Sequence, residues 1–119
     1  MTSFKKVFFC TKEELNKNRY IIKFFDNLND ELIIFLNKDK KIKIFSSICP
    51  HFGGEITYNS TKNQLTCKWH DWRFCSESGK CLTHPIKGRL NTYDFEINPK
   101  NLNKYLFSTD KENIFVMYE

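Results

Sequence analysis

The sequence predicts an all-β fold, because short β-type runs recur at close spacing, polar turns separate them, and only one stretch has a helical pattern. Asn, Asp, Gly and Pro, which bend a backbone at little cost, gather between the runs. We therefore expect about eight strands in antiparallel meanders. The runs are Val7–Cys10, Tyr20–Phe25, Leu32–Leu36, Ile42–Phe45, Leu65–Cys67, Trp72–Phe74, Thr92–Ile97 and Ile114–Tyr118.

The one helical stretch covers Thr11 to Leu15. Thr11 is a good N-cap, and Glu14 follows three residues later, which is the pattern of a capping box. We therefore expect a single short helix directly after the first strand.

The length and composition limit the kind of protein. With 119 residues, 40% of them hydrophobic, the chain is expected to fold as one domain over residues 1–119. The net charge is +5, but the lysines are scattered, so a solvated surface is the simplest interpretation and steering toward an acidic partner the alternative. No recognised basic motif or aromatic platform accompanies the charge, so nucleic-acid binding is not expected.

Targeting and redox signals point to the cytoplasm. No stretch approaches the roughly 20 apolar residues that cross a bilayer, and the N-terminal residues do not form a signal peptide, so no membrane association is expected. Five cysteines in such a chain favour metal ligation or free thiols over a disulfide framework.

Two pairs of metal-ligand residues lie in the middle of the chain. The first is Cys49 with His51 and the second is Cys67 with His70, with fifteen residues between His51 and Cys67. Each pair follows a predicted strand, so two loops could converge on one site.

Two thiolates and two imidazoles suit either a tetrahedral zinc ion or a [2Fe–2S] centre in which two histidines ligate one iron. Zinc fingers usually group two cysteines and then two histidines, whereas here each loop offers one of each. The spacing therefore favours the iron–sulfur cluster, with zinc and a metal-free site as the alternatives.

These residues resemble those of a Rieske domain of the ferredoxin and ring-hydroxylating-oxygenase type. The resemblance is carried by Cys49-Pro50-His51-Phe52-Gly53-Gly54-Glu55, by Cys67-Lys68-Trp69-His70-Asp71-Trp72-Arg73-Phe74, and by the segment from Ser78 to Pro85. It implies stacked antiparallel sheets with a cluster-binding part, about residues 46–86, formed by two ligand loops.

The resemblance also implies the role of each ligand. Cys49 and Cys67 would bind the inner iron, His51 and His70 the outer iron, and the segment around Pro85 would cover the cluster from a third side. Gly53 and Gly54 fit a backbone that approaches the sulfides closely.

Four positions indicate a branch of the family. Respiratory Rieske proteins are expected to have a disulfide where this chain has Gly54 and Trp69, and hydroxyl side chains where it has Trp72 and Phe74. Without those hydroxyl donors the reduction potential should lie near the low end of the Rieske range, about −150 mV. Asp71 stands where the family usually has glycine, and it would lower the potential further if it lies near His70.

The remaining candidates receive structural interpretations. Cys10, Cys75 and Cys81 are expected to act as small apolar residues, and His84 as a surface histidine outside the site. Trp72 and Phe74 are expected in the core, while Trp69 is the better candidate for a partner contact.

The expected function is that of a one-electron carrier between a reductase and an oxygenase or related oxidoreductase, and so a component of an oxidoreductase system rather than a self-contained catalyst. One alternative is a small Rieske-fold subunit or interaction module of a larger redox complex, similar to the small subunit of nitrite reductase. The other is a zinc-stabilised structural module.

Overall fold

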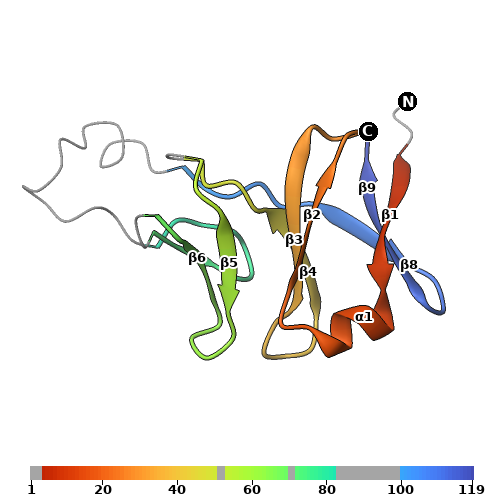
Figure 1. Cartoon of the computed structure of the whole chain (residues 1–119), viewed down its shortest axis with the longest axis horizontal. Coiled ribbons are helices and arrows are strands. Elements are labelled where there is room, and N and C mark those ends of the chain that lie inside the picture. Colours follow the sequence, from red (N-terminus) through yellow and green to blue (C-terminus); the bar gives the residue numbers. More distant parts are fainter. Residues whose placement is uncertain (1–3, 51–52, 70–71, 83–99) are drawn as a thin grey trace, which may run out of the picture.

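The computed structural model describes residues 4–50, 53–69, 72–82 and 100–119. The predicted all-β class is confirmed: nine strands in three antiparallel sheets, together with one short helix, make up the regular structure of these segments (Figure 1). The expected strand Thr92–Ile97 lies outside the described residues.

The first sheet brings the two ends of the described chain together. Strand β1 (Lys5–Thr11) pairs with β9 (Asn113–Tyr118), and β9 pairs with β8 (Leu106–Thr109). Helix α1 (Lys12–Lys17) follows β1 directly. The predicted capping box at Thr11 is present, with each partner of the Thr11–Glu14 pair accepting a hydrogen bond from the other's backbone N–H.

The second sheet has β3 (Asp30–Leu36) at its centre, between β2 (Ile21–Phe25) and β4 (Ile42–Ser46). The residues from Leu32 to Phe35 are all buried, which explains why this strand is a continuous apolar run instead of an alternating one. The far edge of β4 is also occupied, because Tyr105 N–H donates to Ile44 O at 2.9 Å and Ser46 N–H donates to Asn103 O at 2.9 Å.

The third sheet carries the predicted ligand region. It consists of β5 (Ile56–Asn59), β6 (Gln64–Cys67) and β7 (Arg73–Cys75) in sequence order. Neither β5 nor β8 is among the predicted strands. Both are four residues long, and β8 leaves most of its side chains exposed, so the hydrophobic signal of a buried strand is weak there.

Two hydrophobic cores lie on either side of the central sheet, and β3 contributes to both. Ile33 and Phe35 join the core beneath the third sheet, while Leu32 and Ile34 join the core shared with β1 and β9. Figure 1 accordingly shows β5 and β6 on one side of the β2–β3–β4 sheet and the β1–β9–β8 sheet on the other. Trp72 and Phe74 are buried in the first of these cores, as predicted.

Candidate metal centre

The first ligand loop starts from a rigid base at the end of β4. Ser47 is fully buried, its N–H donates to Glu31 O at 2.7 Å, and its hydroxyl donates to Glu31 Oε1 at 2.9 Å. Ser46 is also held, because its hydroxyl donates to Asp30 Oδ1 at 2.9 Å. The backbone leading into Cys49 is therefore fixed by two neighbouring residues of β3.

The loop itself closes tightly on Cys49. Cys49 N–H donates to Gly54 O at 2.8 Å, and Gly53 N–H donates to Cys49 O at 2.9 Å. The turn needs a residue with φ of +77° at Gly53, a conformation that glycine adopts without steric cost. An isolated bridge between Ile48 and Glu55 closes the two ends of the loop.

The second ligand loop connects β6 to β7. Cys67 is the last residue of β6, and its N–H donates to Trp72 O at 2.8 Å across the loop. The loop is also hydrogen-bonded to the first one, since Lys68 N–H donates to Glu55 O at 3.0 Å. The expectation that two strand-end loops converge is thus met by their described parts.

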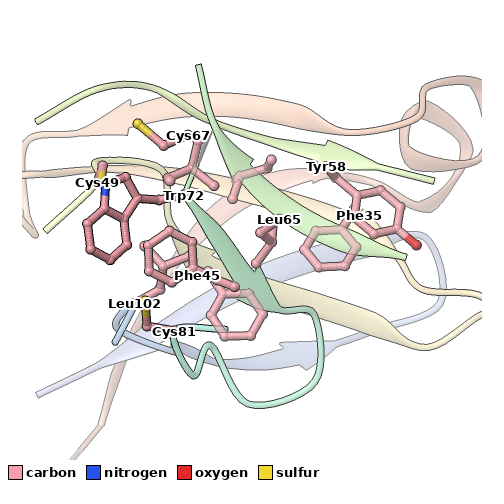
Figure 2. Close-up of a cluster of buried hydrophobic side chains, with 12 residues drawn as sticks. Phe35, Phe45, Cys49, Tyr58, Leu65, Cys67, Trp72, Cys81 and Leu102 are labelled. Carbon is pink, nitrogen blue, oxygen red and sulfur yellow. The ribbon is translucent and has the colours of Figure 1, made fainter. Parts of the chain in front are cut away.

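The two predicted thiol ligands are buried at one end of the same core. Cys49 is 2% exposed and Cys67 is 1% exposed. Figure 2 shows both cysteines beside Trp72 at one end of this core, away from Phe35 and Tyr58. None of the five cysteines, all of which are described, forms a disulfide.

Gly54 lies directly against the sulfur of Cys67. A Cβ atom built on Gly54 would lie 2.7 Å from Cys67 Sγ, closer than real Cβ contacts occur. The backbone of the first loop therefore lies so close to Cys67 Sγ that no side chain would fit at position 54. This close approach, together with two buried thiols on adjoining loops, fits a compact metal–sulfur group held by both loops.

The other predicted site residues lie outside the described segments. Among them are the predicted imidazole ligands His51 and His70, together with Asp71 and Pro85. Their assignment stays a prediction. His84, which was expected outside the site, also lies outside the described residues. The described start of the segment that leads to Pro85 is fixed by two hydrogen bonds: Leu82 N–H donates to Arg73 O at 2.8 Å, and Cys81 N–H donates to Asn101 Oδ1 at 2.9 Å.

An ion pair also connects the two loops. Lys68 Nζ lies 2.9 Å from Glu55 Oε1, and this hydrogen bond with its charge attraction raises the pKa of Lys68. Both side chains are substantially exposed, so the pair contributes little stability. No pattern in the sequence indicates this contact, because Glu55 and Lys68 become neighbours only when β5 and β6 pair.

The other cysteines differ from one another more than expected. Cys10 and Cys81 are buried, as predicted. The expectation for Cys75 was wrong: its side chain is partly exposed at a turn, where Glu77 N–H donates to Cys75 Sγ at 3.4 Å. Burial raises the pKa of the Cys75 thiol, but hydrogen bonds from Ser78 and Glu77 outweigh it and bring the pKa below its usual value.

These environments predict a pH-dependent difference in thiol reactivity. Burial and nearby Glu14 raise the pKa of Cys10 to about 11, so Cys10 stays protonated at the pH where Cys75 already ionises. We expect iodoacetamide to alkylate Cys75 roughly tenfold or more faster than Cys10 at about pH 8, because the thiolate is the nucleophile. Peptide mass spectrometry over time would measure both rates. Equal alkylation rates of Cys75 and Cys10 in the folded protein would contradict the predicted difference between the two thiols.

The described fold and the paired thiol loops define a small antiparallel β domain built to hold a metal–sulfur group. A family model for the Rieske [2Fe–2S] domain matches residues 5–94, and the chain belongs to this family. Membership implies one [2Fe–2S] cluster for the domain.

Among curated proteins, the chain is similar to an oxygenase component of Rhodococcus rhodochrous assigned as a 3-ketosteroid-9-alpha-monooxygenase. The two are 33% identical over 66 residues, which cover 55% of this chain and 16% of the relative. The aligned part thus spans about one-sixth of that oxygenase component.

Solved structures with the same fold come from several kinds of Rieske protein. The plasma-membrane Rieske protein of Synechocystis PCC 6803 superposes with a TM-score of 0.71 at 18% identity, covering 92% of this chain and 97% of that one. The ferredoxin of carbazole 1,9a-dioxygenase from Nocardioides aromaticivorans IC177 gives 0.66 at 18% identity, covering 93% and 95%.

A third structure, assigned as the small subunit of an NADH-dependent nitrite reductase from Mycobacterium tuberculosis, gives a TM-score of 0.67 at 15% identity and covers 99% of this chain and 98% of that one. At these identities the likeness shows the fold alone. In the described residues, the structure contains no helix of the length and apolar character that a membrane crossing requires.

Proposed function

We propose that this chain is a one-electron carrier that takes electrons from a reductase and delivers them to an oxygenase or a related oxidoreductase. The observation that carries the proposal is the pair of buried thiols, Cys49 and Cys67, on loops that are hydrogen-bonded to each other. A bound [2Fe–2S] cluster supplies reversible transfer of single electrons.

The residues of the chain have separate roles in this proposal. Cys49 and Cys67 would hold the inner iron, and His51 and His70 the outer one, as the family resemblance implies. The core around Trp72 excludes water from the thiolate side. Water exclusion disfavours added charge, and Phe74 has no hydroxyl to offset this effect, so we expect a reduction potential near the low end of the Rieske range, about −150 mV.

The decisive experiment is low-temperature EPR of the dithionite-reduced protein, isolated without oxygen, together with iron and zinc analysis. We expect a Rieske-type signal and about two irons per chain. Zinc, or no metal and no signal, would overturn the carrier proposal and support a structural or interaction module. A redox titration of the same sample measures the potential.

Substitutions of the thiols provide a matched test of the ligands. We expect Cys49→Ser and Cys67→Ser each to lower cluster content about tenfold or more, because a serine hydroxyl is a far poorer ligand for iron than a thiolate. Cys75→Ser is the control, because Cys75 is the last residue of β7 and its sulfur accepts a hydrogen bond from the turn that follows, so it is not a predicted ligand. Retention of the full EPR signal by Cys67→Ser would contradict the ligand assignment.

A dedicated small subunit of a larger redox complex is the second candidate. The fold of the chain is compatible with this role, because nearly the whole chain matches the nitrite reductase subunit structure, as it also matches the ferredoxin structure. Size-exclusion chromatography of the protein from its native source discriminates between the two: a monomer that reduces more than one acceptor supports the carrier, and a stable complex supports the subunit.

A further inference from the structure

Trp69 has an unusual position for a large aromatic residue. Its side chain is 66% exposed, although it lies two residues after Cys67, which is almost completely buried. An exposed indole in the loop between two predicted ligands is not explained by core packing. The part of the ring that is not exposed shows what it contacts.

The indole of Trp69 packs on the backbone of the opposite ligand loop. A Cβ built on Gly54 would lie 3.1 Å from Trp69 Cγ and 3.2 Å from Cδ2. The same point is 2.7 Å from Cys67 Sγ. The indole and the Cys67 sulfur therefore both lie against the Gly54 backbone, and these contacts join the first loop to the second.

A second side-chain contact between the loops, the Glu55–Lys68 ion pair, is weak. The Glu55–Lys68 ion pair is exposed on both sides, so water competes for both charges. The apolar contact of Trp69 with Gly54 has no such competitor, because neither surface gains hydrogen bonds when it separates. The Trp69–Gly54 contact is also close to Cys67 Sγ, because both Trp69 and this sulfur lie against Gly54. The ion pair, in contrast, is formed by the exposed ends of two long side chains.

We propose that Trp69 is a positioning residue that clamps the two ligand loops together and shields Cys67 Sγ from solvent. This inference rests on the proposed function only where it concerns the bound cluster. The clamp itself is a property of the protein chain, since it depends on the packing of Trp69 and of Cys67 Sγ against Gly54, which the chain provides alone.

The test compares Trp69→Ala, Trp69→Phe and the unaltered protein. The readout is the rate at which the visible absorbance of the cluster disappears in air at constant temperature. We expect Trp69→Ala to lose its cluster roughly tenfold faster, because a residue supporting a metal ligand typically has an effect of this size. Trp69→Phe keeps a ring over Gly54 and should lie between the two. Equal rates for Trp69→Ala and the unaltered protein would overturn the proposal.

A matched control separates the clamp from a general effect of removing an exposed aromatic side chain. Phe24 in β2 is 56% exposed and belongs to a sheet other than the one that carries Cys67. Phe24→Ala should leave the rate of cluster loss unchanged. If Phe24→Ala accelerates the loss as much as Trp69→Ala, the clamp is excluded.

A second measurement keeps the clamp testable if the purified chain carries no cluster, which would be a failure of the proposed function. In that case iodoacetamide labelling, followed by mass spectrometry, gives the alkylation rate of Cys67 relative to Cys49. Trp69→Ala should raise this ratio severalfold by uncovering Cys67 Sγ. An unchanged ratio would overturn the clamp independently of the cluster.

Discussion

Gly54→Ala should largely abolish cluster binding. The new methyl group would lie 2.7 Å from Cys67 Sγ and 3.1 Å from the Trp69 ring. Trp69 is exposed and can swing away. Cys67 is almost completely buried on a paired strand, so turning its sulfur to another rotamer would push it into packed neighbours or away from its present position. We expect cluster affinity to fall about tenfold or more, measured as iron and sulfide per chain with the EPR signal.

The neighbouring glycine provides the control for this substitution. Gly53 has a φ of +77°, but a Cβ there would meet no atom of the described residues within 4 Å. Gly53→Ala therefore adds backbone strain of about 1–2 kcal/mol without a clash. We expect it to lower the free energy of unfolding by that amount while most of the cluster is retained. If Gly54→Ala keeps its full cluster content, or if only Gly53→Ala loses the cluster, the close approach of Gly54 to Cys67 does not control cluster binding.

Most of the strands could be predicted from the sequence because they carry strong apolar runs. The residues Leu32–Phe35 of β3 are buried on both faces, and Ile114 and Val116 of β9 alternate with more exposed neighbours. The strand β5 was missed because it is short and its burial depends on pairing with β6. Such partner-dependent strands have little signal of their own.

The convergence of the two cysteine-bearing loops could be predicted because Cys49 and Cys67 each lie at or just after a predicted strand end, and the structure places both on adjoining loops. The contacts between the loops could not. The difference from respiratory Rieske proteins indicated only that no disulfide joins positions 54 and 69, whereas the structure places the Trp69 ring against the Gly54 backbone. The pairing of Glu55 with Lys68 likewise depends on the register of β5 and β6.

Gly79→Ala is expected to be the most destabilising of the glycine substitutions. Gly79 has a φ of +77°, and its Cβ would lie 2.7 Å from Leu102 O and 2.8 Å from Phe45 Cε1. Neither neighbour can give way easily: Phe45 is fully buried, and Leu102 N–H donates to Gly79 O at 2.8 Å. Backbone strain and overpacking together should lower the free energy of unfolding by about 3 kcal/mol.

Comparison with Gly53→Ala divides this loss into its two causes. Both glycines have the same φ, but the described residues place atoms within 4 Å of the Cβ position only at Gly79. The free energy of unfolding of both variants is measured by urea denaturation. The loss in Gly53→Ala gives the energy of backbone strain, and the additional loss in Gly79→Ala gives the energy of the clash. Because Phe45 and Leu102 belong to the same core as Cys49 and Cys67, the clash at Gly79 should also accelerate cluster loss. Equal destabilisation by the two substitutions would mean that the 75–80 turn moves away from Leu102 at no cost, and that the core beneath the metal centre tolerates displacement on that side.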